Sequence, residues 1–522
     1  MSLRNILIYL VVTIPVTLSL ISCSREKSVE SPIVARVGER VITADEFRYS
    51  YEFGFGMLKK GKNPRRIYLD YMIDELLLAN EGFSQGLNKV PYVTKRLQRR
   101  KKNDMLEAYY ARHVHSKVHI PEDKLQDAIK KSTVIFRLII WPAPTLQEAE
   151  AVRLATRKSS LEDFIEKQIA QQEVKLSSKK SYETDWIDYL EMPPVVFNRI
   201  KDLPVGQTSE PFPYAEGYAV AEVLDINLQG ITESQLYYGA RRKNIKERLY
   251  NVQSDSIMHA LMDSVLTPLD VRVKGEVVER LAPPLYQWYK DGLPEQRSIF
   301  TKFENMPDTA KSYLKEINLL RGETLLTYAK GEKTVDDYLT FMDYYRKALK
   351  ENKSFEDFKN ILVTEIGRQI MDETFFDLAA KEGFADSVNI VNDLKVWEEK
   401  WTYDVYRSEL VKELDVTDQE MHDYFKNRYK ELDIANVDTS RFYKYEVPVY
   451  NAVLYDKHMA VINRKLSELR KKYPVSINDD VLNSLELTES KKANDITLFA
   501  RKKYSWEAVV PGLDIKWFNL NN

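Results

Sequence analysis

The sequence predicts an α+β fold that is mainly α. Helix-capping residues followed by apolar positions at helical spacing recur along most of the chain. The region from about residue 132 to 228 instead begins and ends with β-branched and aromatic runs, which are typical of strands. The order of motifs in the first half also recurs in the second half. We therefore expect a duplicated helical core with one α/β domain inserted in its first copy.

Composition places the chain among multidomain globular proteins. Its 522 residues are 44% apolar, which suffices for roughly three domains of about 100 to 200 residues each. The 77 basic residues are balanced by 79 acidic ones, so the net charge does not favour nucleic acid as a partner. The single cysteine cannot form a disulfide within the chain.

That cysteine, Cys23, ends an N-terminal export signal. The apolar stretch Ile6–Leu20 is short for a spanning helix of about 20 residues, and polar residues follow Cys23. Leu20-Ile21-Ser22-Cys23 resembles the lipobox of bacterial lipoproteins, which implies lipidation of Cys23 and removal of residues 1–22 as a signal peptide. Ser24 favours the outer membrane under the sorting rule of enteric bacteria. The alternative is a signal anchor with a chance cysteine.

A tether and a first helical core follow the signal. Residues 23–32 are polar and lack periodicity, whereas residues 33–131 are predicted to form the core. Two short strands are expected on either side of Gly38, and Thr43 begins a capping box for the next helix. Longer helical patterns run through Tyr68–Leu87 and Tyr92–His119.

A second module is predicted over residues 132–228. Thr133–Trp141 and Gly217–Ile226 are rich in β-branched and aromatic residues, so we expect one strand to open the module and another to close it. Residues 229–282 contain a long amphipathic helix, Glu233–Leu266, and a short strand. These elements are predicted to complete the first core.

The second half repeats landmarks of the first. Gly38-Glu39-Arg40 recurs as Gly331-Glu332-Lys333, and the helix Ile73–Gly86 recurs as Met371–Gly383. The alternative is that helical segments share generic capping chemistry by chance.

These landmarks set the remaining boundaries. Residues 283–323, which begin with Pro283-Pro284, are predicted as a linker, and 324–440 as the second core. Residues 441–522 are expected to hold a remnant of the inserted domain, with one strand between Arg441 and Leu454, and a core-completing helix.

Taken in order, these motifs resemble the exported parvulin-type foldases of the SurA and PrsA class. In the core the resemblance depends on Val37–Phe47 and Tyr71–Leu78. In the module it depends on Glu148–Ala151, Asp163-Phe164, Asp185-Trp186, Gly206–Pro211 and Gly217–Val223. Together these cover about residues 33–281. The resemblance implies a helical chaperone core interrupted by a parvulin peptidyl-prolyl isomerase domain.

The module departs from the family at its two histidine positions. Parvulins frame the prolyl ring with one histidine on the first strand and another on the last, and the matching positions here are Arg137 and Ala219. No histidine lies between His119 and His259, so a shifted alignment cannot restore the pair. Phe197 and Phe212 are candidates for a surviving apolar pocket, although such aromatic residues more often fill a core. We therefore expect a degenerate site with no catalytic residue.

Other candidate sites are weaker. His113, His115 and His119 have no neighbouring cysteine or carboxylate set, so no metal and no cofactor is predicted. The basic run Lys95–Lys102 is typical of a solvated helix face, or of contact with anionic lipid headgroups. The 32 tyrosines suit the binding of extended chains as well as ordinary core packing.

The sequence thus favours a lipid-anchored envelope chaperone on the periplasmic face of the outer membrane. Its expected partners are unfolded exported polypeptides, in particular outer-membrane proteins, bound with little or no isomerase activity. One alternative is an active, divergent peptidyl-prolyl isomerase. Another is a structural lipoprotein subunit of an envelope assembly machine.

Overall fold

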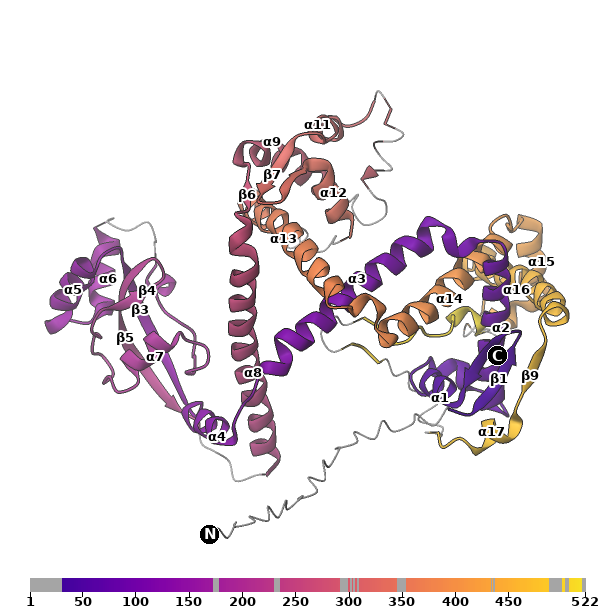
Figure 1. Cartoon of the computed structure of the whole chain (residues 1–522), viewed down its shortest axis with the longest axis horizontal. Helices are drawn as coiled ribbons and strands as arrows, with labels where there is room; N and C mark the ends of the chain where they lie inside the picture. The colour runs from indigo at the N-terminus through magenta and orange to yellow at the C-terminus, as the bar shows by residue number, and fades with distance from the viewer. Residues whose placement is uncertain are drawn as a thin grey trace, which may run out of the picture. The chain divides into compact units, whose positions relative to one another are not determined.

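The computed structural model describes residues 31–171, 178–229, 235–291, 299–300, 303, 306–307, 309–344, 354–432, 434, 437–487, 500–502 and 507–518. In this part of the chain helices dominate, accompanied by three small three-stranded sheets (Figure 1), which confirms the predicted α+β, mainly α class. The signal segment and Cys23 lie outside the described residues. No described helix is long and apolar enough to cross a membrane.

The chain folds into two compact units. Unit 1 combines Met1–Glu107 with Ala380–Asn522, and unit 2 is the continuous stretch Ala108–Ala379. Unit 1 therefore takes one part from each half of the sequence, and unit 2 takes the remainder of both.

The first elements follow the sequence pattern closely. β1 (Ile33–Val37) and β2 (Arg40–Thr43) form a hairpin around Gly38, whose φ of 60° suits a glycine. Thr43 caps α1 (Ala44–Glu52), because its side chain accepts a hydrogen bond from the Glu46 N–H. The helices that follow are α2 (Pro64–Ser84), α3 (Pro91–His113) and α4 (Glu122–Lys131).

The inserted module is built on an antiparallel sheet in the order β3-β5-β4. β3 (Val134–Ala143) pairs along its length with β5 (Gly217–Leu228), and β4 (Phe212–Tyr214) lies on the other side of β5. Helix α7 (Pro194–Ile200) packs on one face of the sheet. The other face is covered by α5 (Leu146–Ala155) and α6 (Leu161–Ala170).

The later helices and strands complete both units. In chain order they are α8 (Gln235–Leu266), β6 (Arg272–Val273), α9 (Gly275–Lys290), α11 (Ser312–Leu320), β7 (Thr324–Tyr328), β8 (Gly331–Thr334), α12 (Val335–Tyr344), α13 (Phe355–Lys381), α14 (Val388–Val411), α15 (Asp418–Arg428), α16 (Glu446–Lys472), β9 (Val475–Ile477) and α17 (Asp479–Ser484).

The two halves present the same succession of elements. A hairpin leads into a short helix and then a long helix in both, as β1-β2-α1-α2 and β7-β8-α12-α13. The long helix ends in each half at a left-handed glycine, Gly86 (φ 74°) or Gly383 (φ 80°), which starts a single 3₁₀ turn. Matching helices α3 and α14 follow. This agreement supports the predicted duplication.

The third strand of each sheet comes from the opposite half of the chain. β9 completes the first hairpin, giving the order β2-β1-β9, and β6 completes the second, giving β6-β7-β8. The expectation that the strand within residues 229–282 completes the first core is therefore wrong. The hydrogen bonds explain the ambiguity, since Asn478 N–H donates to Val34 O in one sheet and Lys274 N–H donates to Leu325 O in the other. The two hairpins thus accept their third strands through equivalent hydrogen bonds.

The linker predicted over residues 283–323 is also wrong in its described part. Pro283 and Pro284 lie inside α9, and α9 and α11 both belong to the core of unit 2. A proline inside a helix costs about 3 kcal/mol. Each buried apolar side chain contributes roughly 1.5 to 3 kcal/mol, and α9 buries one whole face. That face consists of Val277, Val278, Leu281, Ala282, Pro284, Leu285 and Trp288.

The strand expected between Arg441 and Leu454 is a helix instead. α16 begins at Glu446, and Pro448 lies in its first turn, where a missing N–H costs nothing. Val449 and Val453, one helical turn apart, are buried against α15. This tertiary contact overrides the strand propensity of the local sequence.

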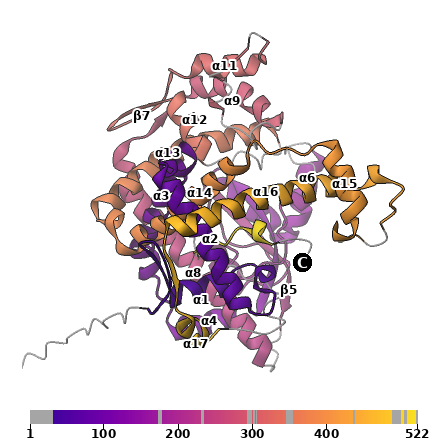
Figure 2. The same ribbon diagram turned by 90° about the vertical axis from the view of Figure 1, so that its right-hand side faces the viewer.

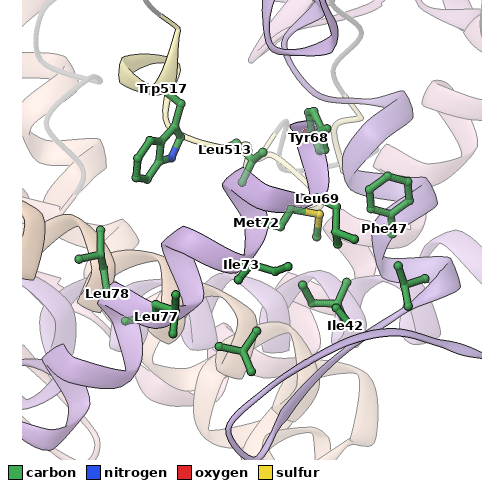
Figure 3. Packing of buried hydrophobic residues seen from close by; sticks show 14 of the residues in the cluster. Ile42, Phe47, Tyr68, Leu69, Met72, Ile73, Leu77, Leu78, Leu513 and Trp517 are labelled. Carbon is green, nitrogen blue, oxygen red and sulfur yellow. The ribbon is translucent and has the colours of Figure 1, made fainter. Parts of the chain in front are cut away.

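The core of unit 1 surrounds α2, which packs on α14 and α16 (Figures 1 and 2). Ile42 and Phe47 pack against α2 from the N-terminal hairpin and α1. Figure 3 shows that Leu513 and Trp517, from a distant part of the sequence, join the same cluster. The 507–518 segment thus lies along the helices of unit 1.

Candidate functional site

The two degenerate histidine positions of the module do not lie together. Arg137 is exposed and pairs with Asp225, whereas Ala219 is fully buried and pairs with Pro142. Arg137 and Pro142 are five positions apart on β3, a separation of roughly 16 Å at about 3.3 Å per residue. Arg137 also lies between Phe136 and Leu138, which share the sheet face of Ala219, so its side chain points to the opposite face.

The two aromatic pocket candidates belong to a single packed cluster. Phe212 is fully buried and pairs with Ala219, and Phe197 packs edge-on against Phe136 with ring centroids 6.4 Å apart. These rings fill the space between the sheet and α7. The core interpretation of Phe197 and Phe212 therefore fits their contacts.

A buried carboxylate in this module was not predicted. Glu222 on β5 is 2% exposed and accepts a hydrogen bond of 2.6 Å from the Leu161 N–H at the start of α6. Burial raises its pKa above the ordinary value. Because this side chain satisfies a helix N-terminus, its role is structural.

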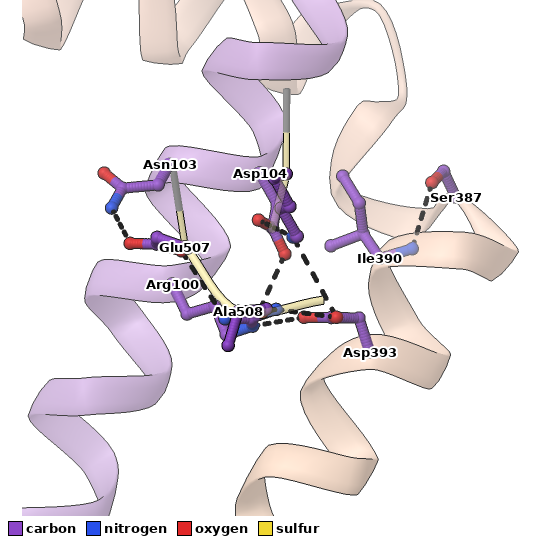
Figure 4. Close-up of polar contacts among 9 residues, drawn as sticks. Arg100, Asn103, Asp104, Ser387, Ile390, Asp393, Glu507 and Ala508 are labelled. Carbon is purple, nitrogen blue, oxygen red and sulfur yellow. Dashed lines mark hydrogen bonds and ion pairs between the residues drawn. The ribbon is translucent and has the colours of Figure 1, made fainter. Parts of the chain in front are cut away.

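The histidine motif and the basic run Lys95–Lys102 both lie within the described residues. Within the described residues, no group of three or more His, Cys, Asp or Glu side chains could hold a metal ion. In the basic run, Lys95 and Arg99 are exposed as expected, but Arg100 is buried. Figure 4 shows Arg100 between α3 and α14, where it bonds to Asp393 and to the Ala508 carbonyl.

The strongest candidate site is a groove in unit 1 that already holds an extended piece of the chain. Helices α1, α2 and α14 form its walls, and residues 510–513 line it as well. A half-open pocket of about 140 Å³ remains beside the segment. Its apolar lining includes Met72, Leu76, Ala79 and Val396.

Glu75, on α2, binds the segment at two points. Its Oε1 accepts hydrogen bonds from the Asp514 backbone N–H at 2.6 Å and from the Trp517 Nε1–H at 3.0 Å. Its Oε2 accepts from Lys400 Nζ of α14 at 2.8 Å. The carboxylate is thereby fully paired although Glu75 is only 8% exposed.

A second polar group holds Asp514. Tyr403 Oη donates to Asp514 Oδ2 at 3.0 Å, and Arg407 Nη1 donates to Tyr403 Oη at 2.8 Å. Burial acts to raise the pKa of Asp514, but the Lys516 backbone N–H and the nearby cations outweigh it, so this pKa is lower than usual. Asp514 therefore binds as a carboxylate.

The Trp517 indole contacts a guanidinium and an aromatic ring. The Arg407 guanidinium lies 4.8 Å from its ring centroid, and Tyr71 stacks on it at 5.8 Å. Together with the bond to Glu75, these contacts recognise an aromatic ring with an N–H donor.

The other end of the segment is held by a polar contact with α3. Asn103 Nδ2 donates to Glu507 Oε1 at 2.8 Å (Figure 4), and Lys502, which precedes the segment, pairs with Asp104. Burial raises the pKa of Asp104 to about 6 despite this lysine. None of these partners was predicted, because each contact joins residues that are far apart in the sequence. The high tyrosine content was the only feature of the sequence that pointed to a polypeptide-binding surface.

Comparisons with known proteins give distant similarities. No family model and no curated protein matches the chain. A structure of SurA-like chaperones from Campylobacter jejuni is 18% identical, covers 47% of this chain and 100% of its own, and has a TM-score of 0.22.

Two PrsA peptidyl-prolyl isomerase structures are similar at the same level. The Bacillus anthracis protein is 16% identical, covers 38% of this chain and 96% of its own, with a TM-score of 0.22. The Bacillus cereus protein is 15% identical, covers 45% of this chain and 90% of its own, and has a TM-score of 0.20. The chain is thus similar, over less than half of its length, to SurA-like chaperones and PrsA peptidyl-prolyl isomerases.

Proposed function

We propose that this protein is a lipid-anchored cell-envelope chaperone that binds unfolded exported polypeptides, in particular outer-membrane proteins. The observation that carries the proposal is the groove of unit 1, which binds the 507–518 segment through backbone, carboxylate and aromatic contacts. A surface that recognises an extended segment in this way suits an unfolded chain. The sequence resemblance to parvulin-type foldases supports the same function.

The anchor and the location belong to this proposal. The lipobox-like sequence that ends at Cys23 supports lipidation, and Ser24 supports the periplasmic face of the outer membrane. The partners are then unfolded chains that have crossed the inner membrane.

Little or no isomerase activity is part of the proposal. Arg137 and Ala219 replace the family histidines and lie on opposite faces of the sheet. Phe197 and Phe212 pack into the module's core.

An aggregation assay tests the function. An unfolded outer-membrane β-barrel protein is diluted from urea with and without an equimolar amount of the purified chain, and light scattering is followed. We expect scattering to fall at least threefold. Unchanged scattering would contradict the proposal, and a pull-down that yields one stoichiometric partner in place of varied clients would favour a structural subunit.

A further inference from the structure

The 507–518 segment is attached mainly by side-chain recognition. Within it, the only regular element is a single 3₁₀ turn, Ile515–Trp517. Its buried anchors are Leu513 and Trp517, whereas Ile515 is 46% exposed. Apart from the local bonds that join it to residues 500–502, its Asp514 N–H bonds to the Glu75 carboxylate of α2, and its Lys516 N–H bonds to its own Asp514 carboxylate. Such an attachment resembles a bound peptide more than an integral strand.

The segment also fills its groove incompletely. A half-open pocket of about 140 Å³ lies beside residues 510–513. Gly512 contributes no side chain to it. A Cβ at this position would meet only the Phe55 ring, at 3.7 Å, and Gly512 is not among the glycines with positive φ. A Cβ therefore fits here in ordinary van der Waals contact.

We propose that the 507–518 segment is a tethered ligand that occupies the polypeptide-binding groove and competes with clients. The groove accepts a segment with a single 3₁₀ turn that presents an aromatic side chain to Tyr71 and Arg407 and a backbone N–H to Glu75. An acidic residue three positions before the aromatic one, as Asp514 stands before Trp517, bonds to Tyr403. This inference rests on the proposed function and specifies its site and its regulation.

Gly512 gives the competition a direction. A client segment with a larger apolar residue at this place gains a contact with Phe55 that the protein's own segment lacks. We therefore expect such a client to displace the tethered segment.

Two substitutions in the intact chain should change the binding of an unfolded protein in opposite directions, because one weakens and the other strengthens the hold of the groove on the 507–518 segment. Trp517→Ala removes the aromatic anchor and is expected to strengthen the binding of reduced, carboxymethylated α-lactalbumin, a permanently unfolded protein, at least threefold. Gly512→Leu adds an apolar side chain beside Phe55, should hold the segment more firmly and is expected to weaken that binding at least threefold. Ile515→Ala, at an exposed position of the same segment, is the control and should change nothing.

A labelled peptide of residues 507–518 tests the groove directly. It should bind the intact Trp517→Ala chain at least tenfold more tightly than the wild-type chain. Adding Glu75→Gln to that chain should abolish the gain, whereas Glu81→Gln, equally buried on α2, should preserve it.

The outcomes separate the two proposals. If the peptide behaves as expected but no variant binds the unfolded protein, the tethered-ligand inference stands and the chaperone function fails. If all variants bind the unfolded protein equally and the peptide does not bind, the chaperone function stands and the inference is overturned. Circular dichroism of each variant confirms that the fold is retained, and a Trp517→Ala chain that unfolds would show that the segment is an integral part of the core.

Discussion

The indole Nε1 of Trp517 donates a hydrogen bond of 3.0 Å to Oε1 of Glu75, a residue 442 positions earlier in the chain. The same carboxylate oxygen accepts the Asp514 N–H at 2.6 Å. One buried carboxylate on α2 thus binds both a backbone N–H and a side-chain N–H of the 507–518 segment.

Trp517→Phe removes the indole donor and keeps an aromatic ring. We expect the free energy of unfolding of unit 1 to fall by about 1 to 2 kcal/mol, because a hydrogen bond to a charged group is lost while Glu75 keeps its other partners. Urea unfolding measures the change. Trp186→Phe is the matched control, since Trp186 is 40% exposed, and an equal loss in both variants would contradict the role of the Glu75 bond.

Replacement of Cys23 tests the anchor. Cys23→Ala should abolish labelling by a fatty-acid probe and move the protein out of the membrane fraction, because no other cysteine is present in the chain. Ser22→Ala keeps a small residue before the cysteine and should leave labelling intact. Undiminished labelling of the Cys23→Ala protein would refute lipidation at this position.

Prolyl isomerisation should be accelerated negligibly by the intact chain. Each tenfold of acceleration requires about 1.4 kcal/mol of barrier reduction, and the module lacks the two-histidine frame. Adding Arg137→His and Ala219→His together should recover no activity, since the two positions lie on opposite sheet faces. A protease-coupled assay on a proline peptide measures turnover. Robust wild-type turnover that is lost on substitution of Phe197 or Phe212 would reveal an active, divergent enzyme.

The carboxyl of Asp74 makes stability depend on pH. Burial raises its pKa from 3.8 to about 6, despite the ion pair with Arg470 at 2.5 Å. The folded state then binds the proton more tightly than the unfolded state. The contribution of this group to the free energy of unfolding therefore decreases as the pH rises from about 4 to about 6, by at most about 3 kcal/mol.

Asp74→Asn removes this titration. The free energy of unfolding of wild type minus that of the variant should fall as the pH is raised from 4 to 6.5, and then level off. Urea unfolding at a series of pH values provides the measurement. Asp45→Asn, where the carboxylate is 71% exposed, is the control, and a pH-independent difference for Asp74→Asn would contradict the raised pKa.

The strand exchange between the halves can be tested by cross-linking. Val37 faces Val475 in the β1–β9 pair, at a position without reciprocal backbone hydrogen bonds, where Cα atoms are about 4.5 Å apart. In a chain with Cys23→Ser, the pair Val37→Cys and Val475→Cys should therefore form a disulfide, detected by mass spectrometry of the linked peptides. Val37→Cys with Val273→Cys should not. The reverse result would place β6, not β9, beside β1.

Local features of the fold were predictable from local residues. Thr43 caps its helix as expected, and Gly86 and Gly383 end the two long helices where the repeat places them. These features depend on a residue and its near neighbours in sequence, so propensity and spacing reveal them.

Features that depend on distant residues were not predictable in the same way. Pro283 and Pro284 suggested a boundary, but burial of the α9 face keeps them in a helix. The groove around Glu75 exists only once α2, α14 and the 507–518 segment are brought together. No periodicity in any one of these segments indicates the other two.

Because the third strand of each sheet comes from the opposite half of the chain, the two sheets can be completed only in a certain order during synthesis. Unit 2 is continuous in sequence, so its β6-β7-β8 sheet can close as soon as residue 334 has been synthesised. β1 is synthesised much earlier but keeps an unpaired edge until Val475–Ile477 follows, and an unpaired strand edge invites pairing with other chains. For most of its synthesis the chain thus exposes the kind of surface that we propose it covers in other proteins.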